Sequence, residues 1–200
     1  MCSRFEIDAT PGDIAERFGL AAPPPLPNAP EIRPTDMALI IDAPVIGNGE
    51  KPRLLSWGLA VEWDATPLIN ARAETLSRKK TFRALLENRC LVPATAYFEW
   101  RKDGPARRKN RIGTKSRGVF AFAGLTDGDR FIIITCPPAA DIASIHDRMP
   151  VILERRAEPL WIDRGTPFNE ISGLLVPYGA EPLWAEEETP PPARQPDLFS

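Results

Sequence analysis

Short apolar runs, separated by turn-forming residues, dominate the hydrophobic pattern of this chain. They are rich in β-branched and aromatic residues and are too short for typical helices, so they predict β-strands. The last two flank Asp127-Gly128, a dipeptide that favours a tight turn, and are expected to pair as a hairpin. The predicted strands occupy residues 37–42, 54–63, 90–100, 118–125 and 131–135.

Helical signals are fewer. Thr10-Pro11-x-Asp13 has the form of a capping box with proline at the first helical position, and Gly19 is placed to end the helix that follows. A proline-rich connector covers residues 22–30, and further helices are predicted at 79–89, 139–145 and 155–162. Together these elements predict an α+β fold, with a curved, largely antiparallel, barrel-like sheet and flanking helices.

Composition limits the domain organisation. A chain of 200 residues, 43% of them hydrophobic, is long enough for one domain with a substantial core. We place this domain at residues 1–176, because residues 177–200 are acidic, rich in proline and poor in apolar side chains, which predicts a disordered tail. Neither a signal-peptide core nor a membrane-length apolar run is present in the sequence, so a cytoplasmic protein is expected. We also expect a monomer.

Charge and cysteine content exclude some classes of protein. A net charge of −2 argues against a strongly basic nucleic-acid binder, but residues 101–117 hold eight basic side chains and one acid. That segment is either a phosphate-facing loop or a solvated flexible one. The three cysteines have no metal-ligand spacing and suit a reducing compartment; Cys90 and Cys136 lie in apolar stretches that predict burial.

Cys2 carries the most distinctive candidate chemistry. Once Met1 is removed, Cys2 has a free α-amine and a thiol on adjacent carbons, with ordinary pKa values near ~8 and ~8.5. Such an aminothiol condenses with an aldehyde, first as an imine and then, after the thiol closes on the imine carbon, as a thiazolidine. The alternative is a cysteine at position 2 without function.

Other candidate residues each allow a functional and a structural interpretation. His146 is the sole histidine and suits proton transfer near neutral pH, or a structural hydrogen bond. Glu99, between Phe98 and Trp100, is either a buried carboxylate with a raised pKa or an exposed strand residue. Asn70 and Arg72 share one side of an extended segment, or form a helix cap and a surface arginine.

The order of short motifs along the chain is more specific than any one of them. MCSRFE, SWGL, NARAET, RCLVPA, YFEW, FAFAGL and IHDRMPVIL occur in sequence between Cys2 and about Leu175. In this order they resemble the SRAP (SOS response-associated peptidase) family, also called abasic-site-processing proteins. The resemblance implies an α+β fold, a basic groove for single-stranded DNA containing abasic sites, and covalent attachment to DNA through the N-terminal cysteine. A protein bound to DNA in this way would be nucleoid-associated.

The same resemblance assigns roles to individual residues and implies no metal or organic cofactor. Cys2 would be the nucleophile, Asn70 and Glu99 would position and protonate groups around its amine, and His146 would open the deoxyribose ring. The DNA contacts would come from Arg4, Trp57, Arg72 and Arg148. Ser3 stands where the family usually has glycine, which leaves less room in the turn that presents Cys2.

The end of the chain and the family name add further hypotheses. Gln195, Leu198 and Phe199 lie in a QPDLF peptide that resembles those binding the bacterial sliding clamp. A peptidase or hydrolase that uses Cys2 as its N-terminal nucleophile is one alternative to DNA cross-linking. A non-catalytic single-stranded DNA adaptor that recruits the clamp is the other.

Overall fold

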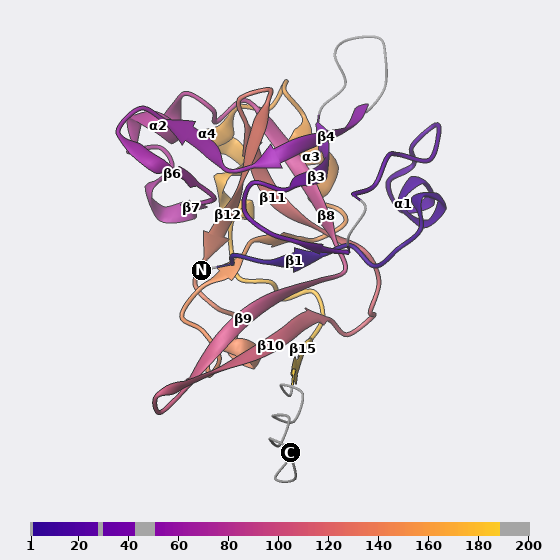
Figure 1. The fold of residues 1–200 in the computed structure, drawn as a ribbon. Coiled ribbons are helices and arrows are strands. Elements are labelled where there is room, and N and C mark those ends of the chain that lie inside the picture. The colour runs from indigo at the N-terminus through magenta and orange to yellow at the C-terminus, as the bar shows by residue number, and fades with distance from the viewer. Residues whose placement is uncertain (1, 28–29, 43–50, 189–200) are drawn as a thin grey trace, which may run out of the picture.

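A closed five-stranded β-barrel forms the core of the molecule (Figure 1). The computed structural model describes residues 2–27, 30–42 and 51–188. Around the barrel each strand pairs with the next, and β11 and β12 close it as the predicted hairpin across Asp127-Gly128. All pairs are antiparallel except β4 with β12. In barrel order the strands are β12 (Arg130–Cys136), β4 (Lys51–Trp57), β3 (Met37–Asp42), β8 (Arg89–Ala94) and β11 (Phe120–Thr126).

Aromatic side chains fill the core. Trp57 stacks on Phe131 with ring centroids 6.4 Å apart, and Phe5 meets the Trp57 ring edge-on at 5.1 Å and the Phe122 ring at 5.8 Å. The Trp57 indole N–H donates to the Ile69 carbonyl at 2.9 Å. Because Trp57 has no exposed surface, the expectation that it lines a DNA-binding surface is wrong. Trp57, the tryptophan of the SWGL motif, is a core residue.

A second, antiparallel sheet continues from the barrel. Its strand order is β15 (Leu183–Glu187), β10 (Ala106–Thr114), β9 (Ala96–Asp103), β1 (Phe5–Glu6) and β2 (Glu31–Ile32). Only Thr95 separates β8 of the barrel from β9, and its backbone N–H donates to the Glu6 carbonyl at 2.7 Å. The chain therefore bends from one sheet into the other at a point that is hydrogen-bonded to β1.

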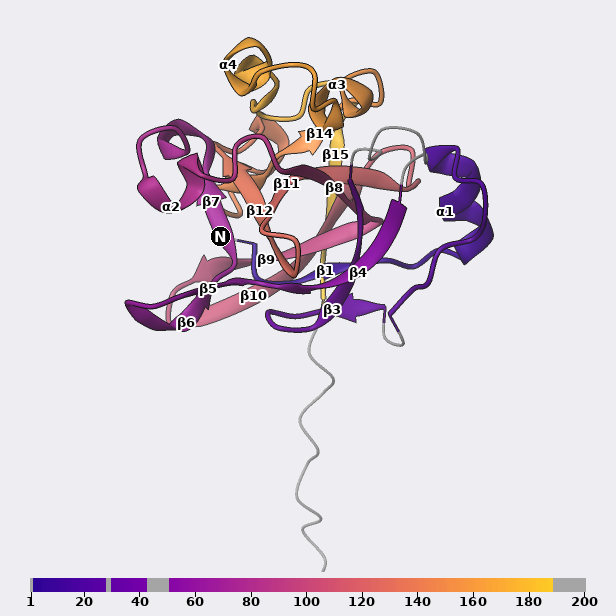
Figure 2. The same ribbon diagram turned by 90° about the horizontal axis from the view of Figure 1, so that it is seen from above.

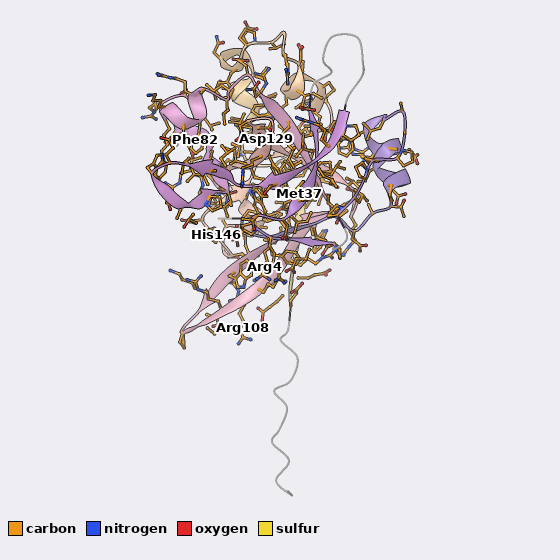
Figure 3. All side chains as sticks on the ribbon, turned by 45° about the horizontal axis from the view of Figure 1, so that its top comes forward. Arg4, Met37, Phe82, Arg108, Asp129 and His146 are labelled. Atoms are coloured by element: carbon orange, nitrogen blue, oxygen red, sulfur yellow. The ribbon has the colours of Figure 1, made fainter. Side chains whose placement is uncertain are left out.

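The second sheet corrects two expectations. The basic segment 101–117 is mostly the projecting β9–β10 hairpin instead of a loop, and Figure 3 shows Arg108 on it. The C-terminal segment does not become unstructured at residue 177, because β15 pairs with β10 over five residues. Gln195, Leu198 and Phe199 lie outside the described residues, and their binding to a clamp stays a prediction.

The N-terminal helix forms as predicted. α1 (Pro11–Phe18) starts at the Thr10–Asp13 capping box and ends at Gly19, which has the left-handed conformation typical of a helix C-terminus. The other predicted helices are shorter: α2 (Lys80–Arg83), a 3₁₀ turn η2 (Ala140–Ile142) and α3 (Glu158–Ile162). Arg89, at the end of the helix predicted for residues 79–89, instead begins β8. Its buried guanidinium donates to the carbonyls of Trp161 and Thr166.

Short elements complete the fold. Figure 2 shows α3 and α4 (Phe168–Ile171) beside β14, with α1 on another side of the molecule. No helix in the described part of the chain is long and apolar enough to cross a membrane. The α+β class and the barrel-like core are confirmed. The remaining elements are β5 (Leu59–Val61), β6 (Asp64–Leu68), β7 (Asn70–Arg72), η1 (Ala73–Thr75), β13 (Met149–Pro150), β14 (Ile152–Leu153) and η3 (Ser172–Leu174).

The two tryptophans near the β4–β5 turn should differ sharply in their effect on stability. Trp57→Ala should lower the free energy of unfolding by about 3–5 kcal/mol, because it removes a fully buried ring from the aromatic core. Trp63→Ala is the matched control; its side chain is 68% exposed, so a change within about 0.5 kcal/mol is expected. Urea denaturation measures both. Equal effects of the two substitutions would contradict the placement of Trp57 in the core.

Candidate functional site

Two strands hold Cys2 in place. It directly precedes the β1 region, where Phe5 pairs with Tyr97 of β9 and the Phe98 N–H donates to the Arg4 carbonyl at 3.0 Å. On the other side, the Asn70 side-chain amide donates to the Cys2 carbonyl at 2.6 Å. Asn70 begins β7, which is fixed by parallel pairing with β12. The backbone of Cys2 is thus attached to the second sheet and to the barrel.

The thiol of Cys2 is buried and protonated. It has no exposed surface, and its Sγ–H donates to the Arg4 carbonyl at 3.4 Å. Burial, followed by the negative charge of Glu99, raises the pKa of this thiol far above its ordinary value. A thiolate at this position therefore requires a change in its surroundings or a group that stabilises the negative charge.

Glu99 and His146 form a proton-handling pair next to Cys2. Glu99 is only 2% exposed, and burial raises its pKa to about 7. One of its oxygens lies 3.6 Å from His146 Nε2. Burial also lowers the pKa of His146, whose Nδ1 accepts the Arg148 backbone N–H at 3.1 Å and lies 3.0 Å from an Asp147 carboxylate oxygen. This pair is suited to exchange a proton near neutral pH.

The structure brings the four residues predicted for catalysis into one place. Asn70 contacts Cys2, Glu99 acts on it electrostatically, and His146 lies against Glu99. They come from the N-terminus, β7, β9 and the segment between η2 and β13, which are far apart in the sequence. Strand pairing within the barrel and within the second sheet brings them together. Among the described residues, no group of three or more His, Cys, Asp and Glu side chains has the arrangement of a metal site.

A cleft opens at His146. Its volume is about 460 Å³, and its walls include Trp100, Lys102 and Arg107 from the β9–β10 hairpin and Asp147 from the following segment. An aromatic ring and two cations beside the proton-handling pair are a suitable lining for a polyanionic ligand with planar groups. The sequence pointed only to a basic segment here, and did not single out these residues.

Two of the three arginines predicted to contact phosphates are engaged within the protein. Arg4 pairs with Glu31 at 2.8 Å and its guanidinium lies 5.5 Å from the centre of the Trp100 ring. Arg148 forms an ion pair with Glu74 and donates to the Thr135 carbonyl at 2.7 Å. Arg72 is exposed on β7. Figure 3 shows Arg4 and His146 in the same region of the molecule.

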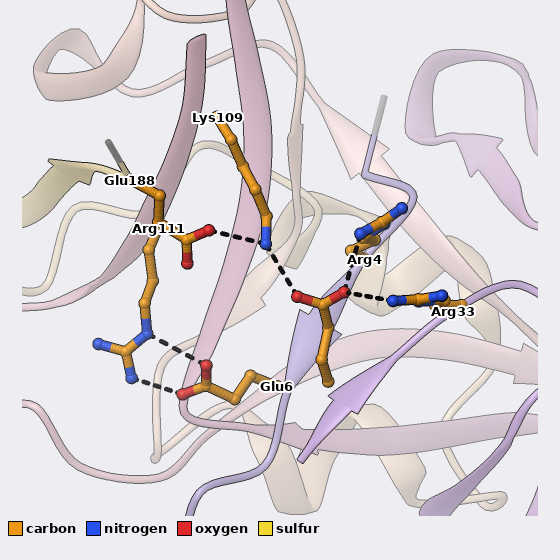
Figure 4. A network of polar contacts seen from close by, with 7 residues as sticks. Arg4, Glu6, Arg33, Lys109, Arg111 and Glu188 are labelled. Carbon is orange, nitrogen blue, oxygen red and sulfur yellow. Dashed lines mark hydrogen bonds and ion pairs between the residues drawn. The ribbon is translucent and has the colours of Figure 1, made fainter. Parts of the chain in front are cut away.

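Acidic residues also neutralise much of the basic hairpin, as Figure 4 shows. Lys109 lies 2.8 Å from carboxylate oxygens of both Glu31 and Glu188, and Arg111 forms two hydrogen bonds with Glu6. The segment is therefore neither a free phosphate-facing loop nor a solvated flexible one. These partners were hidden in the sequence because strand pairing, not proximity along the chain, brings them together.

Comparison with known proteins agrees with this architecture. The model of the SOS response associated peptidase (SRAP) family matches residues 1–187. The chain belongs to this family. It is 36% identical to the abasic site processing protein YoqW of Bacillus subtilis (strain 168), over 92% of this chain and 91% of that protein. The B. subtilis abasic site processing protein YoaM is 34% identical over 92% of this chain and 89% of its own length.

A solved structure extends the comparison. An X-ray crystal structure of a protein from Bacteroides thetaiotaomicron superposes with a TM-score of 0.79 at 27% identity, covering 93% of this chain and 91% of that one. The family resemblance seen in the sequence motifs is thus confirmed. The individual roles of Cys2, Asn70, Glu99 and His146 remain predictions.

The raised pKa of Glu99 should be visible in the pH dependence of stability. The folded state holds the Glu99 proton up to about pH 7, whereas a free glutamate loses it near pH 4.5. Wild type should therefore lose stability relative to Glu99→Gln as the pH rises through this interval, and the difference should level off above it. The total is a few kcal/mol, at about 1.4 kcal/mol per pKa unit.

Urea denaturation of both proteins across this pH range measures the difference. Glu170→Gln, at an exposed position of α4, is the matched control and should show no such slope. A difference that grows in favour of wild type with rising pH would contradict the raised pKa of Glu99.

Proposed function

We propose that this chain recognises abasic sites in single-stranded DNA and becomes covalently linked to them through Cys2. The observation that carries the proposal is the placement of Cys2 between the Asn70 amide and the Glu99–His146 pair, in an SRAP-family chain. Curated relatives of this chain are named abasic site processing proteins. An aldehyde is the substrate class that this set of residues suits best.

The reaction begins once Met1 is removed, because only then does Cys2 carry a free amine beside its thiol. An abasic deoxyribose is mostly a closed hemiacetal, so a proton must move from the C1′ hydroxyl to the ring oxygen to expose the aldehyde. The amine adds to the aldehyde carbon and water leaves, giving an imine. The sulfur then bonds to the same carbon, the C=N π electrons become a nitrogen lone pair, and the thiol proton is transferred to nitrogen. One water is released in total, without oxidation or reduction.

Each neighbouring residue has a defined part in this scheme. Asn70 fixes the Cys2 carbonyl and so directs the amine and thiol. Glu99, with a pKa of about 7, can donate a proton to the departing hydroxyl or accept one from the amine. His146, neutral and within 3.6 Å of Glu99, serves the opening of the sugar ring.

DNA binding requires an exchange of partners at the surface. For Arg4 and Arg148 to hold phosphates, they must release Glu31 and Glu74 or share their guanidinium groups with the DNA. Arg72 is exposed and needs no such release. Trp100, which Arg4 covers at the edge of the cleft, is the aromatic residue best placed to contact a base in the role expected of Trp57.

A denaturing gel tests the covalent step. Wild-type protein, with Met1 removal verified by mass spectrometry, is incubated with single-stranded DNA containing one abasic site and then heated in detergent. A shifted band is expected for wild type and for Cys90→Ala, the matched control, and no band is expected for Cys2→Ala. Glu99→Gln should form the band at least about tenfold more slowly, in the range of general acid–base effects.

The same experiment separates the alternatives. A wild-type protein that binds the DNA but leaves no heat-stable band would favour a non-catalytic adaptor and refute the cross-link. Repeated cleavage of peptides that depends on Cys2, again without a band, would favour the N-terminal-nucleophile peptidase.

The competition between Glu31 and DNA gives a separate prediction. Glu31→Gln releases Arg4 and leaves Lys109 with Glu188 as its acidic partner, so the affinity for undamaged single-stranded DNA should rise by about threefold or more at low salt, with a steeper salt dependence. Fluorescence anisotropy measures both quantities. Glu170→Gln removes the same charge from a remote helix and should leave them unchanged. Unaltered binding by Glu31→Gln would argue against phosphate contacts by Arg4.

A further inference from the structure

Buried polar atoms without a hydrogen-bond partner gather around the candidate site. In the described part of the chain they include Asn70 Oδ1, Arg148 Nε and the hydroxyl of Tyr97. Native proteins rarely leave such atoms unsatisfied, and an exception calls for a functional explanation. Asn70 and Arg148 already have proposed roles, whereas Tyr97 has none.

Strand pairing places Tyr97 beside the N-terminal segment that carries Cys2. It lies two residues before Glu99 on β9, so both side chains project from the same face of the sheet. Its pairing partner on β1 is Phe5, three residues after Cys2. The ring is fully buried and packs edge-on against Phe122, with centroids 6.1 Å apart.

The buried hydroxyl of Tyr97 lies close enough to Cys2 and Glu99 for their charges to affect it. Burial raises the pKa of Tyr97 well above its ordinary value, and negative charge on Cys2, Glu99 or Cys136 raises it further. The phenol therefore keeps its proton and acts as a hydrogen-bond donor. The described surroundings of Cys2 supply a carbonyl acceptor for its neutral thiol, the Arg4 oxygen, which cannot stabilise a thiolate.

We propose that the Tyr97 hydroxyl donates a hydrogen bond to Cys2 Sγ as negative charge develops on the sulfur. Tyr97 would act in this way while the thiazolidine ring closes, so this part of the proposal rests on the proposed function. The sulfur bonds to the imine carbon, and the thiol proton is transferred to the nitrogen. Tyr97 keeps its own proton throughout. A donor aimed at a developing anion in a water-excluded site lowers the barrier without being consumed.

Tyr97→Phe tests the proposal, because it removes one oxygen and preserves the ring. Loss of an unsatisfied buried hydroxyl should not lower stability. Removal of a hydrogen bond to a charged group should lower the single-turnover cross-linking rate at saturating DNA on the order of 10- to 100-fold. Binding to DNA with a tetrahydrofuran abasic analogue, which lacks the aldehyde, should be unchanged. Tyr178→Phe, at the only other tyrosine of the sequence, is the matched control.

A second readout does not depend on DNA. Iodoacetamide alkylation of Cys2, followed by mass spectrometry of the N-terminal peptide, reports the thiolate fraction at each pH. In Tyr97→Phe the rate should fall by a similar factor at every pH below the thiol pKa, and should equal that of wild type when both proteins are unfolded in guanidinium. Tyr178→Phe should follow wild type throughout.

The outcomes are distinguishable. Unchanged alkylation of Cys2 in Tyr97→Phe overturns the proposal, whether or not cross-linking slows, since a packing defect alone would then account for any slower reaction. If wild type forms no cross-link but Tyr97→Phe still lowers the alkylation rate, the contact between Tyr97 and the Cys2 sulfur stands and the proposed function fails.

Discussion

The pairing of β1 with β9 is the interaction on which the candidate site depends. Although β1 spans only two residues, it brings the N-terminal segment alongside the strand that carries Glu99. Phe5 also inserts among Trp57 and Phe122. Anchoring by a core aromatic compensates for the few hydrogen bonds of so short a strand, and it gives the second residue of the chain a fixed position.

Burial then sets the chemistry of the site. The same low-polarity surroundings keep the Cys2 thiol protonated, hold the Glu99 proton to near-neutral pH and keep His146 uncharged. Burial therefore moves the pKa values of Glu99 and His146 toward each other, which favours proton exchange between them, and moves the pKa of the Cys2 thiol away from both. The paired arginines and glutamates outside this pocket have the opposite arrangement, with charge balanced by partners at the surface.

Sequence reasoning was most successful where the signal was local. The capping box of α1 and the hairpin at Asp127-Gly128 are encoded by adjacent residues and were located correctly. The order of motifs also gave the family and the four clustered residues. What failed depends on distant pairing. Trp57, expected at the DNA-binding surface, lies inside the barrel, and β15 becomes ordered by pairing with β10 despite its acidic sequence.

Strand β12 has a consequence for the dynamics of the site. On one side it pairs with β4 and then β7, and on the other with β11 and then β13, so its backbone is enclosed by four strands. β7 carries Asn70, and the segment leading into β13 carries His146. Separation of β7 or β13 from β12 would move Asn70 or His146 relative to Cys2 and Glu99. The spacing between Asn70 and His146 is therefore set largely by the hydrogen bonds of one barrel strand, and a displacement of β12 would shift both residues together.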